Sequence, residues 1–414
     1  MPTTVPAESV DDFRQRAGAW LAATMPPLDP EKAAQLAYDE LPAWWRAREL
    51  QKLLYDGGFA GICFPREYGG LGLGYEYKKA FDAEAAAYEM PLILNVPSFA
   101  ICCATILDTG SEAQKRSHIG AALCGDEVLV QLLSEPGGGS DLAGVITRAD
   151  RRDGRWVING AKTWSTAAFA ADYGLCLART DWDVPKHEGL TMFLVPLAHP
   201  GVTINRIRQV NGSVEFCEEF FDDVAVGDDA VVGEPGRGWE VASRQLYHER
   251  RAMGNGSEYT SGPGVGEAQS VSIDLLSLAD KMGGGASERV RAMVGRALVH
   301  RAVHRQLGEH VFHGVTSGSL PVAAGSLTRL SMAEVYDIET DTAYTLAGPS
   351  AVVEDGGGVL DAGVRYLSRQ AASIGGGTTE MARNVIGERV LNFPREYAAD
   401  RGVPFNQVRR GNDA

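Results

Sequence analysis

The feature that most constrains the fold is a hydrophobic period that changes twice along the chain. From about Asp11 to Cys124, apolar residues recur three and four positions apart, which places them on one face of an α-helix. From Leu129 to about Val232 the period is two, as in half-buried strands, and after Gly238 the helical period returns. The sequence therefore predicts a helical region, a region of strands and a second helical region, in that order.

The chain has 414 residues, 44% of them hydrophobic, which is enough for two or three packed domains. We place the domains at residues 1–127, 128–234 and 235–414. The central region has several short strands with no helix between them, which favours an antiparallel β-domain over a Rossmann fold. The predicted fold class is α+β, with an N-terminal helical domain, a central antiparallel β-domain and a C-terminal helical bundle.

Glycines indicate where elements end. Asp153-Gly154 and Asn159-Gly160 flank a short apolar run, and each pair is a strong hairpin signal because type I′ turns need positive φ. Gly57 and Gly58 are expected to end a helix. The stretch from Gly254 to Gly266 interrupts the last helical region, and it reads equally as a mobile lid or as a surface linker.

Composition excludes several classes of partner. A formal net charge of −15 disfavours nucleic acid, whose binding needs Lys and Arg against phosphates. We find neither a signal peptide nor an apolar run of about 18 residues, so a membrane partner is not expected. The six cysteines read as buried free thiols, and no CxxC pair offers zinc ligands. We expect a cytoplasmic protein.

The most informative motif is LLSEPGGGSDLAG, from Leu132 to Gly144. Its three consecutive glycines let the backbone approach a ligand closely, and Ser140 and Asp141 offer hydrogen bonds to it. A glycine triplet by itself is more often a flexible turn. Downstream, Trp164 offers a flat apolar surface beside two hydroxyl groups, which suits an aromatic cofactor with polar edges, although a tryptophan in a β-core is often structural.

Taken together and in order, these motifs resemble those of acyl-CoA dehydrogenases. They are EPGGGSD, NGAKTWST, GVTINRI with EFFDDVAV, GEPGRGW at the start of a helix, and the terminal IGGGTTEMARNVIGERVL. The resemblance covers essentially the whole chain. It implies FAD at the junction of the β-domain and the bundle, an acyl-CoA substrate, and removal of hydrogens from Cα and Cβ to give the trans-2-enoyl-CoA.

The resemblance also implies individual site residues. Those expected to contact FAD are Gln131, Leu133, Ser134, Gly139, Ser140, Trp164, Ser165, Thr166, Thr378 and Glu380. Those expected to contact the substrate are Ser140, Arg250, Gly376 and Gly377. No metal is expected.

The catalytic base needs a separate argument, because the position that carries it in many relatives is Gly376, which has no side chain. A subgroup resembling isovaleryl-CoA and some long-chain dehydrogenases carries a glutamate followed by arginine on the helix after the β-domain. Glu249 and Arg250 match that pair. Hydride leaves Cβ only as a proton leaves Cα, so a positioned carboxylate is needed, and we assign Glu249. The alternative is an exposed helix glutamate paired with an arginine.

Two departures from the family pattern bear on assembly. The Arg-x-Phe-Gly segment that reaches the FAD of a neighbouring subunit is missing, and the usual FGGNG segment reads LAGPSAVV near Leu346. Either other groups hold the adenosine end of FAD, or a partner subunit supplies them. A homodimer or homotetramer is the simpler expectation and a heteromer stays open, with an electron-transferring flavoprotein as the acceptor by resemblance.

Three rival readings stay open. A flavin monooxygenase or nitroalkane oxidase of the same fold would need no Cα base. A cofactor-poor partner subunit would be colourless. The third rival is a metal site, although an exposed basic helix is the more common reading of its spacing; its residues are His300, His304, His310 and His313. Acyl length and branching do not follow from the sequence, and the helix-borne base suggests branched, bulky, long or steroid-derived thioesters.

Overall fold

The structure, a computed structural model, describes residues 8–29, 38–253, 257–262, 273–284, 287–353 and 360–408. Two compact units divide the chain. The first takes in the described parts of Met1–Arg208, Val214–Val271 and Asp400–Ala414, and the second those of Gln209–Ser213 and Ser272–Ala399.

Helices form the N-terminal part of the first unit, as predicted. The longer ones are α1 (Val10–Thr24), α3 (Leu41–Asp56) and α4 (Tyr75–Ala85). Ser9 caps α1 by accepting from the backbone N–H of Asp12, and α3 ends at Gly57 with Gly58 at φ 73°, the positive value that glycine tolerates. Aromatic rings fill the core between them, with Phe13 and Phe81 both fully buried and both packed near Phe59.

The central helix of this part is almost entirely buried. It runs from α5 (Leu92–Leu94) through a π-helical stretch (Asn95–Cys103) into α6 (Ala104–Thr109). Pro97 lies inside it, and the wider π-helical turn accommodates a residue that cannot donate a backbone hydrogen bond. Leu92–Thr109 is long and apolar enough to cross a membrane, with a mean hydropathy of 1.6, but 72% of it is buried inside the protein. It is a core helix of the first unit.

Three short helical segments follow and lead into the sheet. They are α7 (Glu112–Gln114), a π-helical turn (Lys115–Ile119) and α8 (Gly120–Leu123). Ser111 and Gln114 form a reciprocal capping box at the start of α7.

Eight strands make one sheet. They are β1 (Leu129–Leu132), β2 (Arg148–Arg152), β3 (Arg155–Thr166), β4 (Tyr173–Arg179), β5 (Leu190–Pro196), β6 (Val202–Arg206), β7 (Phe216–Val226) and β8 (Val231–Val232). Their order is β6-β7-β3-β2-β4-β5-β8, with β1 paired to β4. The predicted central β-domain is present, but its sheet is mixed and not antiparallel throughout, because β1 lies parallel to β4 and one residue pair joins β2 and β4 in parallel. The long connection from β1 to β4, which contains the β2–β3 hairpin, allows this parallel pairing.

One of the two predicted hairpin turns is present. Asp153 and Gly154 have φ values of 48° and 77° and join β2 to β3, as a type I′ turn requires. The second prediction was wrong, because Asn159-Gly160 lies inside β3, where the register against β7 shifts. Gly160 is needed there for a different reason: a Cβ would come within 2.6 Å of Thr147 Oγ1. The pair marks a bulge, not a turn.

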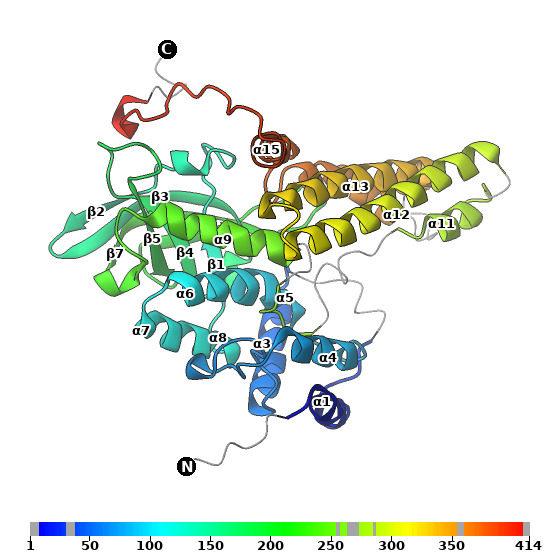
Figure 1. The fold of residues 1–414 in the computed structure, drawn as a ribbon, viewed down its shortest axis with the longest axis horizontal. Coiled ribbons are helices and arrows are strands. Elements are labelled where there is room, and N and C mark those ends of the chain that lie inside the picture. The colour runs from blue at the N-terminus through cyan, green and yellow to red at the C-terminus, as the bar shows by residue number, and fades with distance from the viewer. Residues whose placement is uncertain are drawn as a thin grey trace. The chain divides into compact units, whose positions relative to one another are not determined.

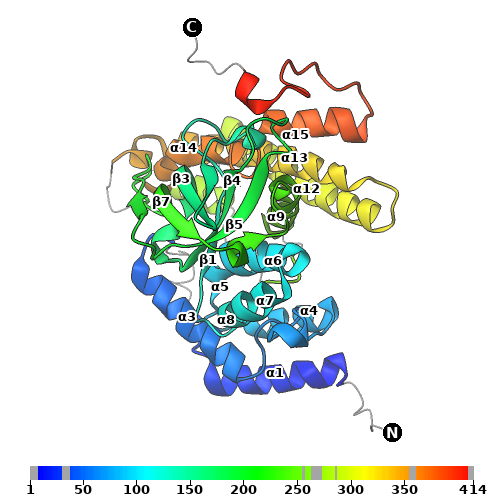
Figure 2. The same cartoon turned by 90° about the vertical axis from the view of Figure 1, so that its left-hand side faces the viewer.

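Helix α9 (Gly238–Met253) packs against both the sheet and the central helix. Figures 1 and 2 show it running beside β5 and α6. Its first residue must be small, because a Cβ on Gly238 would lie 2.6 Å from the backbone of Thr191. Helix α9 belongs to the first compact unit. The predicted domain boundaries remain a proposal.

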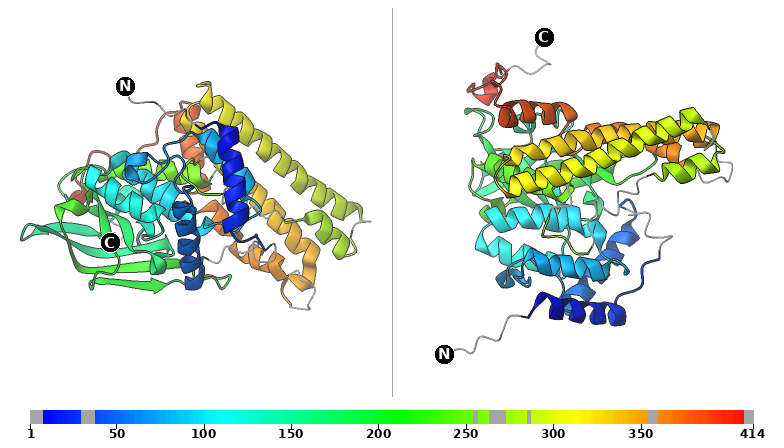
Figure 3. Two further views of the ribbon diagram at one scale, coloured as in Figure 1. Left: turned by 90° about the horizontal axis from the view of Figure 1, so that it is seen from below. Right: turned by 45° about the vertical axis from the view of Figure 1, so that its right-hand side comes forward.

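The second unit contains the long helices predicted for the C-terminal region. They are α11 (Leu275–Lys281), α12 (Glu288–Thr316), α13 (Gly325–Ala347), α14 (Leu360–Ser368) and α15 (Thr379–Val385). Figure 3 shows α12 and α13 side by side along their length. Small residues such as Ala297, Ala343 and Ala347 are fully buried in the core of this unit and allow the close packing.

Two connecting segments add to the first unit. Residues 257–262 belong to the stretch predicted as a lid or linker, and Asn95 exchanges two hydrogen bonds with the backbone of Ser261; residues 254–256 and 263–266 of that prediction lie outside the described residues. Near the C-terminus, Phe405 is buried and lies 3.5 Å from the Arg179 guanidinium, which fixes residues 400–408 to the β-domain.

Candidate active site

The predicted base lies on α9 and its carboxyl contacts the first strand of the sheet. Gln131 Nε2 donates to Glu249 Oε2 at 3.3 Å. Glu249 is partly buried, and burial raises the pKa of its carboxyl, although the bond from Gln131 acts in the opposite direction. A carboxyl with a raised pKa that is held against the sheet has the properties of a general base.

Two glutamines near Glu249 in the fold or along α9, Gln131 and Gln245, have side-chain polar atoms without hydrogen-bond partners in the described part of the chain. Among the described residues, Gln131 Oε1 and both side-chain polar atoms of Gln245 are buried without a hydrogen bond. Gln245 is fully buried and precedes Glu249 by four residues, so the two share a face of α9. Buried polar groups are normally satisfied. The unmet donors and acceptors therefore fit a polar ligand such as the edge of a flavin ring or a thioester carbonyl.

The glycine motif forms an exposed loop directly after β1. Added Cβ atoms on Gly137 and Gly138 would meet nothing within 4 Å, and one on Gly139 would lie 3.5 Å from Ser134 Oγ. Ser140 is exposed in the same loop, whereas Leu133 is buried beneath it. The backbone of this loop is thus free to approach a ligand closely.

A buried ion pair supports that loop from below. Lys162 is fully buried and its Nζ lies 2.9 Å from Glu135 Oε1 and 3.0 Å from the carbonyl of Leu133. Glu135 also accepts from the backbone N–H groups of Ile146 and Thr147 at 2.7 and 2.8 Å. Burial alone would raise the pKa of Glu135, but Lys162 and these amides together lower it. The carboxylate therefore joins both ends of the loop to β3.

Trp164, Ser165 and Thr166 lie at the end of β3, beside the start of the loop. The backbone N–H of Thr163 donates to the carbonyl of Ser134 at 2.9 Å. Trp164 is 56% exposed and has φ 64°, whereas Ser165 is 2% exposed and its Oγ donates to Glu219 Oε2 at 3.0 Å. Trp164 thus presents an open aromatic surface, and the Ser165 hydroxyl is turned to the interior.

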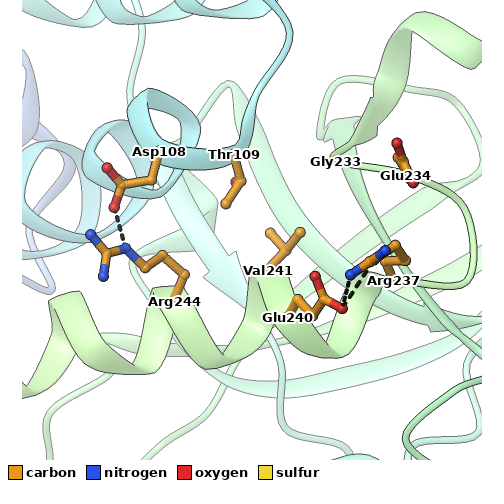
Figure 4. Close-up of a pocket in the computed structure, with 8 residues that line it drawn as sticks. All are labelled: Asp108, Thr109, Gly233, Glu234, Arg237, Glu240, Val241 and Arg244. Atoms are coloured by element: carbon orange, nitrogen blue, oxygen red, sulfur yellow. Dashed lines mark hydrogen bonds and ion pairs between the residues drawn. The ribbon is translucent and has the colours of Figure 1, made fainter.

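A pocket of about 580 Å³ lies elsewhere in the first unit, between α6, the residues before α9 and α9 itself. Figure 4 shows two ion pairs in its lining, Arg244 with Asp108 and Arg237 with Glu240. His248, buried behind it, lies 2.7 Å from Asp108. None of the predicted site residues lines this pocket. The contacts of Asp108 with Arg244 and His248 fasten α9 to α6 in the part of α9 that precedes Glu249.

The predicted site residues of the second unit lie together at the start of α15. Thr378 caps that helix by accepting from Met381 N–H at 3.1 Å, and Gly376 and Gly377 have φ values of 69° and 96°. Arg329, which sequence reasoning did not select, donates to the carbonyls of Gly375 and Gly377. Glu380 and, in the first unit, Arg250 are exposed. Among the described residues no group of three or more His, Cys, Asp or Glu could hold a metal ion.

Raising the pH should destabilise the protein more than its Glu219→Gln variant. Burial raises the pKa of Glu219 from 4.5 to about 8. Between these values the folded chain binds more protons than the unfolded chain, so the free energy of unfolding falls as pH rises, by at most about 1.4 kcal/mol per pH unit. Thermal melting of both proteins at about pH 5 and about pH 9 measures this. Equal pH-dependent shifts in the two would contradict it.

Family comparison agrees with this arrangement. Models of the acyl-CoA dehydrogenase N-terminal, middle and C-terminal domains match residues 8–126, 131–224 and 236–391. The chain belongs to the acyl-CoA dehydrogenase family, a family of flavin-binding oxidoreductases. The predictions of family, fold class and acyl-CoA dehydrogenation in fatty-acid or sterol catabolism are confirmed at this level.

Individual relatives are similar over most of the chain. Acyl-CoA dehydrogenase IpdE1 of Mycobacterium tuberculosis is 32% identical, and the match covers 94% of this chain and 99% of the relative. Acyl-CoA dehydrogenase FadE34 of the same organism is 34% identical over 92% of this chain, which spans 51% of that longer protein. The solved structure of the Tcur3481-Tcur3483 steroid ACAD superposes with a TM-score of 0.74 at 27% identity, covering 96% of this chain and all of the other.

Proposed function

We propose that this chain is an FAD-dependent acyl-CoA dehydrogenase in which Glu249 removes the Cα proton of the substrate. The observation that supports it most is the partly buried Glu249 carboxyl, which accepts from Gln131 Nε2 and shares a face of α9 with Gln245. Gln131 Oε1 and the side-chain amide of Gln245 have no hydrogen-bond partner in the described part of the chain. Bound FAD would supply the acceptor for the hydride that leaves Cβ. Everything else in the reaction falls to side chains and backbone of the protein.

The site residues divide this work. Burial raises the pKa of the Glu249 carboxyl, which makes its carboxylate a stronger base toward a proton on carbon. Gln131 Nε2 holds Glu249 Oε2 and fixes where the carboxyl points. The open glycine loop offers backbone N–H groups, Trp164 offers a flat surface, and Arg250 is assigned to the CoA portion. Thr378, Glu380, Gly376 and Gly377 remain proposed contacts.

The proposed substrates are bulky acyl-CoA thioesters, steroid-derived ones among them. A structural relative at 27% identity is named a steroid ACAD, which supports this range. The proposed electron acceptor is an electron-transferring flavoprotein, and the proposed location is the cytoplasm, where six free thiols are expected. A homo-oligomer is the simpler assembly. A heteromer is supported by the Tcur3481-Tcur3483 steroid ACAD, a structural relative whose name joins two proteins.

Anaerobic titration of the purified protein with a panel of acyl-CoAs tests the proposal. We expect a yellow protein whose visible absorbance bleaches with one class of thioester, because electrons from Cα–Cβ enter the flavin without oxygen. A yellow protein that no acyl-CoA bleaches, but that oxygen and another substrate turn over, would overturn it in favour of an oxidase or monooxygenase. A colourless protein that gains flavin only with a second dehydrogenase chain would make it one subunit of a heteromer.

A further inference from the structure

One buried carboxyl in the β-domain has no part in the proposed reaction. Glu219 lies on β7 in an inward-facing row with Cys217 and Phe221, and these three are 0%, 0% and 4% exposed. Period-two packing makes such a row apolar in most sheets. A carboxyl there costs stability unless it is well bonded. Among the described residues, one of its two oxygens is buried without a partner.

The cation across the strand from Glu219 compensates its charge only in part. Lys162 is the cross-strand partner of Glu219, but its Nζ bonds Glu135 and the carbonyl of Leu133. Glu218, next along β7, adds a further negative charge. Burial therefore raises the pKa of Glu219 to about 8, so that the group is largely neutral at pH 7. Its carboxyl accepts a hydrogen bond from Ser165 Oγ at 3.0 Å.

That bond lies inside the bulge that orients the predicted flavin surface. Thr163 pairs with Glu218 and Ser165 with Cys217, so Trp164 is the extra residue of β3. Trp164 has φ 64° and Ala167 has φ 55°, values that bulky or β-carbon-bearing residues rarely adopt. The side-chain bond from Ser165 to Glu219 and the backbone bond from Ala167 to Glu215 at 2.8 Å tie this segment to β7.

We propose that Glu219 is a positioning residue for the flavin: through Ser165 it holds the bulge that turns Trp164 outward and sets Thr166 beside it. The inference rests on the proposed function, because Trp164 and Thr166 are flavin contacts only there. It explains why a carboxyl occupies an inward-facing position of β7, where burying a leucine would cost less free energy. It also reassigns Ser165, whose hydroxyl holds the strand in place of contacting the cofactor.

Flavin uptake by the apoprotein separates this role from plain core packing. FAD is titrated with apoprotein, and its fluorescence quenching gives the Kd while the melting temperature reports folding. For Glu219→Leu we expect an unchanged or higher melting temperature, FAD binding about fivefold to tenfold weaker, and an altered visible band shape. Glu219→Gln should bind FAD nearly as wild type does, since its amide oxygen still accepts from Ser165.

A matched control lies two residues along the same row. Phe221→Leu should lower the melting temperature and leave the Kd for FAD unchanged. Ser165→Ala should weaken FAD binding as Glu219→Leu does, and the two effects should not add in the double variant, which keeps the test decisive if Glu219→Leu does not fold. Wild-type FAD affinity and band shape in Glu219→Leu, or in Ser165→Ala, would overturn the inference. Wild-type protein that takes up no FAD, either alone or with a second dehydrogenase chain, would overturn the proposed function itself.

Discussion

Glu249→Gln should lower the rate of flavin reduction by an acyl-CoA by roughly 100- to 10,000-fold, the range that a general base contributes. The amide keeps the shape of the side chain and its contact with Gln131, but it cannot accept the Cα proton. The melting temperature should not fall, because a buried group with a raised pKa is replaced by a neutral one. Stopped-flow bleaching of the flavin, with FAD content and acyl-CoA affinity measured alongside, gives the result.

The control variant lies on the same helix. Glu240→Gln removes an exposed carboxyl that pairs with its neighbour Arg237, so its reduction rate should match wild type. If Glu249→Gln reduces its flavin as fast as Glu240→Gln does, the base lies elsewhere or the reaction needs none. The second outcome would favour the monooxygenase reading.

Lys162→Met should lower the free energy of unfolding by about 3–5 kcal/mol, because it leaves a buried carboxylate without its cation. The Lys162 side chain is 0% exposed and that of Glu135 is 5% exposed, so solvent offers no replacement. The variant should also take up FAD less well, since Glu135 holds the backbone of Ile146 and Thr147 at the far end of the glycine loop. Denaturant unfolding, followed at its first transition, measures the loss.

An exposed ion pair provides the comparison. Arg16 and Glu8 are 2.9 Å apart with side chains 46% and 35% exposed, so Arg16→Met should cost less than about 1 kcal/mol. A cost for Lys162→Met as small as that of Arg16→Met would mean that the buried pair contributes little, and that the loop is held by its backbone alone.

Much of the fold could be predicted because period and turn chemistry are local. The change from helical to strand spacing near Leu129 and back near Gly238 matches the first strand and α9. The turn wrongly predicted at Asn159-Gly160 and the parallel strand pair that was not predicted both depend on pairing between distant segments. Whether Asn159-Gly160 forms a turn or a bulge depends on whether a long partner such as β7 lies alongside, and the parallel pairing of β1 with β4 joins segments about forty positions apart in the chain.

The residues of the candidate site also fall into those that the sequence could predict and those that it could not. Family motifs were enough to select Glu249, Trp164 and the glycine loop, but their supporting residues depend on tertiary contacts. Gln245 is a polar residue among the buried positions of α9, and Glu219 is a carboxyl in an inward row of β7, so both carried a signal that periodicity could have revealed. Arg329 carried none, because its contact with the glycines before α15 bridges residues far apart in the chain.

The most direct test of Glu249 as the base is the rate of anaerobic flavin bleaching with substrate deuterated at Cα, at Cβ or at neither carbon. If the carboxylate takes the proton as hydride leaves, deuterium at either carbon slows wild-type bleaching severalfold. If deuterium at Cα left the rate of flavin reduction in the wild-type protein unchanged, proton removal by Glu249 would be contradicted.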